Sequence, residues 1–233
     1  MIHSVDVASL PVLTAEQMRE VDRVMIEDLR IELIQMMENA GRNLAQLALE
    51  QWTPGHLVVL AGPGGNGGGG LVAARHLANR GVRVTVSLAA APGRLAPVPA
   101  HQLDILHRMR VPVASEPPEA DLVLDAVLGY SLHGDPTGRA AELIVWANGM
   151  GAPVLALDTP SGLDVTTGAT ATPCVRATAT LTLAALKRGL LRAPEVVGDL
   201  YLGDISVPPT VYRDLGLPEP SAFAEGPIVR VAG

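Results

Sequence analysis

LVVLAGPGGNGGGG, at residues 57–70, is the stretch that decides the fold. Its first five residues are all apolar, which is typical of a parallel strand that is buried on both faces. Seven of the next nine residues are glycine, and an apolar helical pattern follows from Leu71 to Ala78. A strand, a tight glycine turn and a helix N-terminus together present free backbone N–H groups to an anion. The stretch therefore predicts a phosphate-bearing ligand at the start of the helix.

The spacing of the glycines does not by itself identify that ligand. Gly62, Gly64 and Gly67 satisfy the pattern G-x-G-x-x-G, which glycine-dense turns match easily. A dinucleotide site of the usual kind also needs an acid about 20 residues further on, yet no acidic residue lies between Glu50 and Asp104. An ordinary NAD-dependent dehydrogenase is therefore disfavoured. A phosphate-rich ligand held by backbone and arginine side chains stays open, as does a purely structural glycine turn.

Length and composition predict one domain that spans residues 1–233. Hydrophobic residues make up 48% of the chain, but only 3% are aromatic, so Val, Leu and Ala must fill the core. No apolar run reaches the roughly 18 residues that a membrane span needs. The net charge of -7 argues against a nucleic-acid-binding surface. We expect a cytoplasmic protein that binds a small molecule, without nucleic acid or membrane partners.

Strand and helix patterns alternate along the chain, which predicts a three-layer, doubly wound, mostly parallel α/β sheet of the Rossmann-like class. The first 11 residues have no periodicity and are expected to form an N-terminal tail or arm. A capping box of Thr14 and Gln17 begins the first helix. Further strands are expected at residues 82–89, 111–114, 122–127, 153–157, 177–184 and 200–207, and further helices at residues 34–50, 101–109 and 138–148. The proline-rich residues 208–233 are expected to lie across the surface.

Two acidic residues and one lysine are candidates for a functional site. Asp125 lies inside an apolar strand, where an ionised carboxylate is unfavourable unless it is paired or bound to a cation. Asp158 ends the next strand, at the edge of an open α/β sheet where ligands bind. The alternative for Asp158 is a turn in which its carboxylate accepts backbone hydrogen bonds. Lys187, the only lysine of the chain, follows the threonine-rich strand.

Several separated motifs resemble, in the same order, those of the NAD(P)H-hydrate epimerase family, which is built on the YjeF N-terminal domain. They cover nearly the whole chain and comprise LT at residues 13–14, MENAG at 37–41, the segment 62–77, LDAVLG at 124–129 and DTPSGLD at 158–164. The resemblance implies a doubly wound sheet that often forms a homodimer. It also implies a cofactor-repair activity that interconverts the R and S epimers of hydrated NADH or NADPH, so that a separate dehydratase specific for one epimer can remove both.

The resemblance also implies the site residues. Asn66, Asp125 and Ser161 match the ligands of a potassium ion, and Asp158 matches an acid that contacts the substrate. We predict that Asp158 handles the proton in catalysis. The segments that match the substrate-binding loops are Gly65, Asn66, Gly67, Gly68 and Gly69, and Gly129, Tyr130, Ser131, Leu132, His133, Gly134 and Asp135.

The glycine stretch departs from the family's usual Asn-Asn-Gly-Gly-Asp. Gly65 and Gly69 replace an Asn and the Asp, and His133 stands where some relatives have Lys. We expect a flexible loop that weakens substrate binding while leaving the chemistry available. Two alternatives to an epimerase stay open: a non-catalytic nucleotide-binding or scaffold module of the same fold, and a binder of some other nucleotide.

Overall fold

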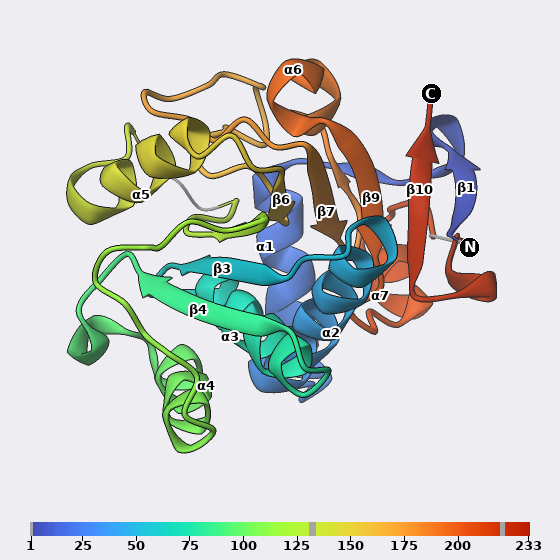
Figure 1. Cartoon of the computed structure of the whole chain (residues 1–233). Coiled ribbons are helices and arrows are strands. Elements are labelled where there is room, and N and C mark those ends of the chain that lie inside the picture. Colours follow the sequence, from blue (N-terminus) through green and yellow to red (C-terminus); the bar gives the residue numbers. More distant parts are fainter. Residues whose placement is uncertain (1, 131–133, 220–221) are drawn as a thin grey trace.

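The computed structural model describes residues 2–130, 134–219 and 222–233. Its centre is an eight-stranded sheet with the strand order β1-β10-β9-β7-β6-β5-β3-β4 (Figure 1), in which neighbouring strands are parallel except β10 and β9. A small second sheet pairs β2 with β8. The strands are β1 (His3–Asp6), β2 (Val12–Leu13), β3 (His56–Ala61), β4 (Arg83–Leu88), β5 (Leu122–Ala126), β6 (Val154–Leu157), β7 (Ala179–Leu183), β8 (Leu186–Lys187), β9 (Asp199–Gly203) and β10 (Ile228–Ala232).

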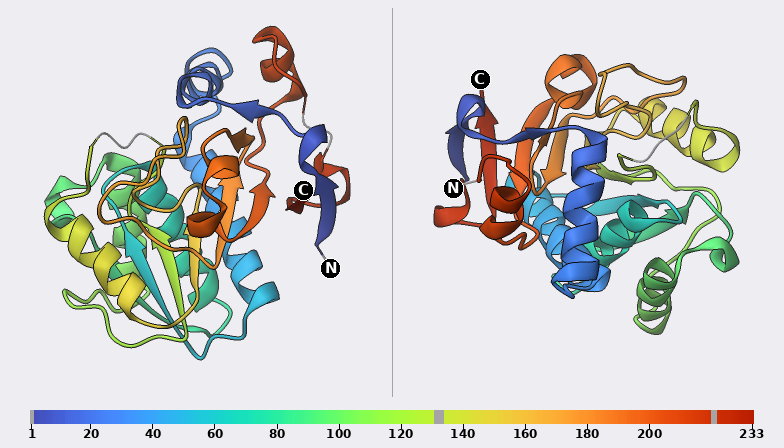
Figure 2. Two further views of the ribbon diagram at one scale, coloured as in Figure 1. Left: turned by 90° about the horizontal axis from the view of Figure 1, so that it is seen from above. Right: turned by 180° about the vertical axis from the view of Figure 1, so that it is seen from behind.

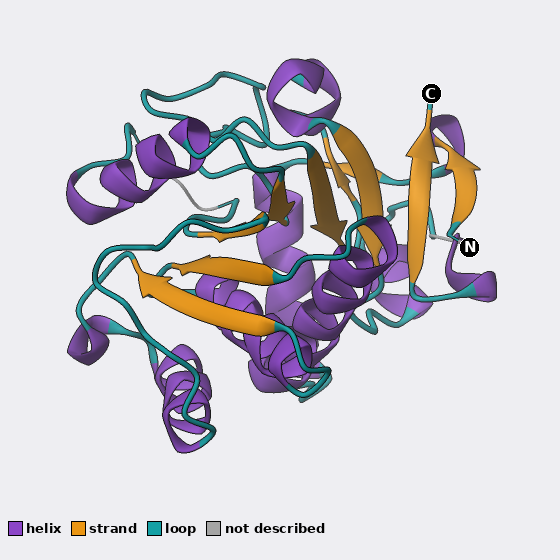
Figure 3. Cartoon of the chain, in the orientation of Figure 1, coloured by secondary structure: helices purple, strands orange, loops and turns teal. Residues whose placement is uncertain are grey.

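Helices lie on both faces of the sheet, which makes three layers (Figure 3). Alternate residues of β3 point to opposite faces, with Leu57 and Val59 in the core beneath α2 and α3, and Val58 and Leu60 in the core beneath α5. The fold class predicted from the sequence is therefore confirmed. The α-helices are α1 (Ala15–Arg23), α2 (Leu33–Gln51), α3 (Gly65–Ala78), α4 (Pro97–Arg108), α5 (Gly138–Gly149), α6 (Pro194–Val197) and α7 (Pro209–Asp214). Among the described residues, no helix has the length and hydropathy needed to cross a membrane.

The order of the strands explains where a site can form. The chain passes from β3 to its neighbour β4 and then returns to β5 on the other side of β3. The crossover helices consequently leave a crevice outside the carboxyl ends of β3 and β5, which is the usual ligand position in such sheets. The glycine run starts at this point, directly after β3. Asp125 lies in β5 between Leu60 of β3 and Ala156 of β6.

Helix α3 begins inside the glycine run, at Gly65, and not at Leu71 as predicted. The reason is close packing, because a Cβ atom at Gly70 would lie 2.6 Å from Cβ of Ala126, and one at Gly68 would lie 2.5 Å from Sδ of Met37. Gly41 of α2 faces α3 in the same way, because a Cβ atom there would lie 2.5 Å from the Gly69 carbonyl oxygen. The glycines therefore serve to bring α3 against α2 and the sheet. The prediction of a flexible glycine loop is wrong.

We expect the substitution Gly70→Ala to lower the free energy of unfolding by about 1–3 kcal/mol, because the added methyl group overpacks a site between α3 and β5. The loss occurs even though alanine favours a helix over glycine by roughly 1 kcal/mol. Gly149→Ala is the matched control, since a Cβ at this glycine of α5 meets no atom within 4 Å. Urea denaturation of both variants checks the prediction, and a Gly70→Ala protein as stable as the Gly149→Ala protein would contradict it.

The two ends of the chain form one edge of the sheet. The sequence predicts a tail or arm for residues 1–11 and a surface segment for residues 208–233, but His3–Asp6 forms β1 and pairs with Ile228–Ala232, which forms β10. Figure 2 shows both termini at this edge. The strand predicted at residues 111–114 is reduced to a single bridge between Val86 and Val113. The predicted capping box of Thr14 and Gln17 is present.

Candidate active site

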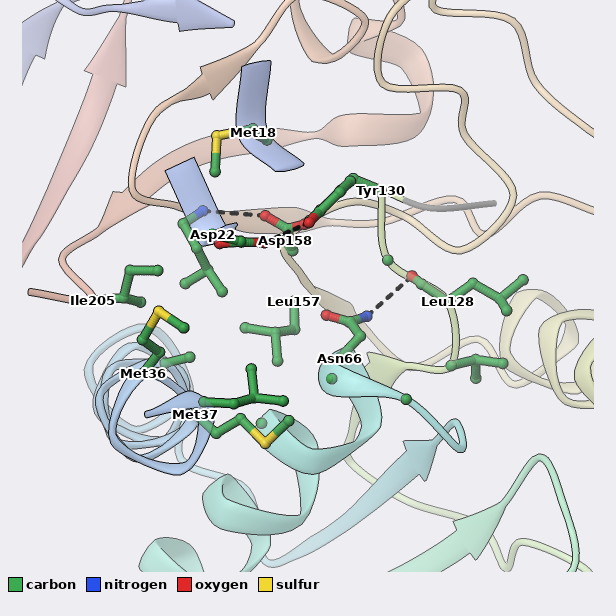
Figure 4. Close-up of a pocket in the computed structure, with 18 of the residues that line it drawn as sticks. Met18, Asp22, Met36, Met37, Asn66, Leu128, Tyr130, Leu157, Asp158 and Ile205 are labelled. Carbon is green, nitrogen blue, oxygen red and sulfur yellow. Dashed lines mark hydrogen bonds between the residues drawn. The ribbon is translucent and has the colours of Figure 1, made fainter. Parts of the chain in front are cut away.

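A cavity of about 460 Å³ opens next to the glycine run, outside the carboxyl ends of β3, β5 and β6 (Figure 4). Its volume falls within the range of small-molecule sites. One wall is apolar and comes mainly from α1, α2 and the sheet, with Met18, Leu33, Met36, Met37, Leu157, Leu183 and Ile205. The polar side chains that line the cavity are Asp22, Asn66, Tyr130, Asp158 and Lys187.

Asp158 and Lys187 form a buried ion pair in this cavity. The Lys187 Nζ donates to Oδ1 of Asp158 at 2.5 Å, to the Leu183 carbonyl at 2.7 Å and to Oγ1 of Thr182 at 3.0 Å. All three ammonium protons are therefore used. The side chain of Lys187 is only 1% exposed and that of Asp158 only 7%. The lysine thus supplies a fixed counter-charge for the carboxylate, in a place where little water is present to solvate either charge.

The backbone directs Asp158 toward this pair. Asp158 directly follows β6, and its φ of 65° lies in the left-handed region, which asparagine and aspartate adopt more readily than most residues. Its N–H donates to the Leu181 carbonyl at 2.7 Å. Oδ1 receives the Lys187 ammonium and the Leu183 N–H. No group of the described chain donates to Oδ2, so this oxygen is available to a ligand in the cavity.

Asp125 lies beneath the cavity and is completely buried. Oδ1 accepts from Ser161 Oγ at 2.6 Å and from the Val127 N–H at 3.2 Å, while Oδ2 accepts from the Ser161 N–H at 2.8 Å. Burial raises the pKa of Asp125 to about 6, although these hydrogen bonds act in the opposite direction. Leu128 links Asp125 and Ser161 to the glycine run, because its N–H donates to Ser161 Oγ and its carbonyl accepts from Asn66 Nδ2.

The three predicted potassium ligands are thus brought into one network, and their chemistry fits a cation. No cationic side chain in the described part of the chain pairs with the Asp125 carboxylate. Asn66, Ser161 and Asp125 offer amide, hydroxyl and carboxylate oxygens, which suit a hard cation. The described residues contain no cluster of three or more His, Cys, Asp or Glu side chains. A donor set of oxygen atoms alone suits a hard cation better than a transition metal.

The structure separates the other predicted substrate-binding residues into three groups. Gly65, Asn66, Gly69, Gly129, Tyr130 and Asp158 line the cavity. Gly67 and Gly68 do not, because they pack against Gly62 and Met37 inside the fold. Gly134 and Asp135 also lie away from it, and Asp135 Oδ1 instead accepts from the Thr172 N–H at 2.9 Å. Ser131, Leu132 and His133 fall outside the described residues.

Asp22 is a cavity residue that the sequence analysis missed. It comes from α1, and its Oδ2 accepts a short hydrogen bond from the Tyr130 hydroxyl. Burial raises the pKa of Asp22, the Tyr130 hydrogen bond lowers it, and the neighbouring Asp158 raises it again. A signal was present in the sequence, since Asp22 stands four residues after Met18 and three before Met25, within the apolar stripe of the helix.

The chain is similar to proteins of known activity over most of its length. The family model described as "YjeF-related protein N-terminus" matches residues 33–189. The NAD(P)H-hydrate epimerase of Dehalogenimonas lykanthroporepellens is 48% identical over 228 residues, which cover 94% of this chain and 92% of that protein. The NAD(P)H-hydrate epimerase of Rhodopirellula baltica is 35% identical, with 91% of each chain covered.

A longer relative and a solved structure also match most of this chain. The bifunctional NAD(P)H-hydrate repair enzyme of Salinibacter ruber is 38% identical over 225 residues, and the match covers 86% of this chain but 42% of that protein. The crystal structure of yeast ynu0 (YNL200c) superposes with a TM-score of 0.83, covering 94% of this chain and 99% of the yeast chain at 24% identity. The last match shows that the fold is shared.

Proposed function

Since the chain belongs to the family of the YjeF-related protein N-terminus, as the motifs predicted, we propose that it is an isomerase that interconverts the R and S epimers of hydrated NADH and NADPH. The observation that carries this function is the Asp158–Lys187 pair, which lies in a cavity beside the glycine run. A match to two epimerases over nine-tenths of their length supports the same conclusion.

The geometry suits the chemistry of a hydrated nicotinamide ring. The hydrated carbon carries a hydroxyl group and is bonded to the ring nitrogen, so its configuration inverts when the hydroxyl leaves and returns on the opposite face. The free Oδ2 of Asp158 acts as a proton-handling group for the hydroxyl as it leaves or returns, while Lys187 holds the carboxylate in place. The apolar wall of methionine and leucine side chains packs against the ring.

The start of α3 suits the phosphates of the same ligand. Gly64 is the N-cap residue of α3, and glycine has no side chain that could cap this end of the helix. The backbone N–H groups at Gly65 and Asn66 are therefore available to an anion, and the helix dipole favours negative charge there. Gly65 leaves space as well, since a Cβ atom at this position would lie 3.6 Å from Cε of Met37.

The function is tested by mixing the protein with the separated R and S hydrates of NADH and following their equilibration. We expect equilibration faster than the spontaneous rate with either epimer as the starting material. A folded protein that binds the hydrates without accelerating their interconversion would instead support the non-catalytic binding module. That Gly65 and Gly69 weaken substrate binding stays a prediction. Because both residues lie in helix α3, the flexibility of a loop cannot be the cause of such a weakening.

A potassium ion held by Asn66, Asp125 and Ser161 is part of this proposal. Its charge would compensate the buried Asp125 carboxylate and fix the segment after β5 against the glycine run. The homodimer, the cytoplasmic location and the absence of nucleic-acid and membrane partners stay predictions from the sequence.

We expect potassium to raise the unfolding temperature relative to an equal concentration of tetramethylammonium, because a ligand that binds only the folded state stabilises it. At a free concentration about tenfold above the dissociation constant, the gain is roughly 1.4 kcal/mol, or about 3–6 °C for a chain of this size. Asp125→Asn should remove the difference, and Asp104→Asn, on the exposed face of α4, should keep it. An equal response of the unmutated protein to both salts would rule out the site.

A further inference from the structure

Two carboxyl groups line the cavity in different surroundings. Asp158 is paired with the Lys187 ammonium. Asp22 has no cationic partner among the residues that the structure describes, and its hydrogen-bond partner is the neutral hydroxyl of Tyr130. Figure 4 shows the side chains of Asp22, Tyr130 and Asp158 converging from α1, from the segment after β5 and from the end of β6. The two carboxyl groups are therefore suited to different protonation states.

The surroundings of Asp22 favour a bound proton. Burial raises the pKa of Asp22 and the negative charge of Asp158 adds to that effect, whereas the Tyr130 hydrogen bond and the Lys187 charge act in the opposite direction, and the net shift is upward. Burial likewise raises the pKa of Tyr130 above its ordinary value, and an ionised Asp22 raises it further, although exposed Arg19 acts in the opposite direction. When the environments of two titratable groups in one site differ in this way, one group serves as the acid and the other as the base.

We propose that Tyr130 and Asp22 form the general acid of the epimerisation, with Asp158 as the base. This inference rests on the proposed function and assigns a second proton-handling group to the same cavity. Tyr130 is the direct proton donor, and Asp22 acts through it. In the structure the Tyr130 hydroxyl is hydrogen-bonded to Oδ2 of Asp22, so a proton can pass from Asp22 through Tyr130 to a ligand in the cavity.

In one direction the transfer balances as follows, and the reverse direction retraces it with protonated Asp158 as the acid and the Tyr130–Asp22 pair as the base. The Tyr130 hydroxyl gives its proton to the substrate hydroxyl and takes one from protonated Asp22. The carbon–oxygen bond breaks, its electron pair leaves with the oxygen as water, and the lone pair of the ring nitrogen forms a double bond to the carbon. Water then adds to the opposite face and gives a proton to Asp158. Solvent takes this proton and returns one to Asp22, so no proton is consumed.

The test compares Tyr130→Phe and Asp22→Asn with the unmutated chain in the epimerisation assay. We expect each variant to lower kcat by about 10²-fold while KM changes little, because the lost interaction belongs to the chemical step. Tyr201→Phe is the matched control, since this buried tyrosine of β9 lies outside the cavity and its loss should leave kcat unchanged.

A pH profile separates this role from a merely structural one. A general acid must be protonated, so kcat of the unmutated chain should fall as the pH rises through the pKa of the acid pair. Asp22→Asn should lose that alkaline limb. The acid role of Tyr130 and Asp22 would be overturned if the variants kept both kcat and the alkaline limb of the pH profile. It would also be overturned if the unmutated chain had no alkaline limb, and in both cases the proposed function would stand. An unmutated chain that does not epimerise the hydrates would overturn the proposed function itself.

Discussion

We expect replacement of Asp158 by asparagine to lower the rate of epimerisation by about 10²- to 10⁴-fold, the range that a positioned acid or base contributes. Asparagine has the size of aspartate and tolerates the left-handed backbone at this position, but its amide cannot accept the substrate proton. The loss should appear in kcat, as measured by following the separated R and S hydrates of NADH. If the variant keeps the kcat of the unmutated chain, the proton-handling role belongs to Lys187 or His133 instead.

The control for this experiment must separate a loss of chemistry from a loss of stability, because Asp158 has a buried partner in Lys187. Asp158→Asn leaves the Lys187 ammonium without its counter-charge, so part of any loss of activity could come from partial unfolding. The double variant Asp158→Asn with Lys187→Met removes both charges and should be folded yet equally inactive. Asp104→Asn makes the same chemical change on the exposed face of α4 and should leave the activity unchanged.

Much of the fold could be predicted because its signals are local. Five consecutive apolar residues before a glycine run mark a buried central strand, and β3 buries Leu57 to Ala61 on both faces. Asp125 and Asp158 were also recognisable, because a carboxylate inside an apolar strand or at its carboxyl end needs a partner. The structure provides Ser161 for the first and Lys187 for the second.

Features that depend on distant partners could not be predicted. Strand β1 has no apolar alternation of its own and exists because the last strand of the chain pairs with it. Glycine has a poor helix propensity, so residues 65–70 predicted a turn, but contacts with Met37 and Ala126 leave no space for side chains there. The sequence marks Asp22 as an acid within the apolar stripe of its helix, but only the tertiary structure brings α1 beside Tyr130 and so gives the acid its partner.

Lys187→Met is expected to have the largest effect on stability, lowering the free energy of unfolding by about 3–5 kcal/mol. The substitution keeps the length and apolar stem of the side chain but removes the charge. It leaves the Asp158 carboxylate buried without its counter-charge, with only the Leu183 N–H still donating to it, and it removes the three hydrogen bonds of the ammonium. For a chain of this size the loss corresponds to a decrease in Tm of about 6–20 °C, which a thermal unfolding curve measures.

The double variant Asp158→Asn with Lys187→Met tests the cause of that loss. If the instability of Lys187→Met comes from an uncompensated buried charge, neutralising Asp158 should restore most of the unfolding temperature, because replacement of a whole buried pair is far better tolerated than removal of one partner. If the cause were lost packing around residue 187, the double variant would stay as unstable as the single one. Arg230→Met, which breaks the exposed pair with Asp199, should leave the unfolding temperature unchanged.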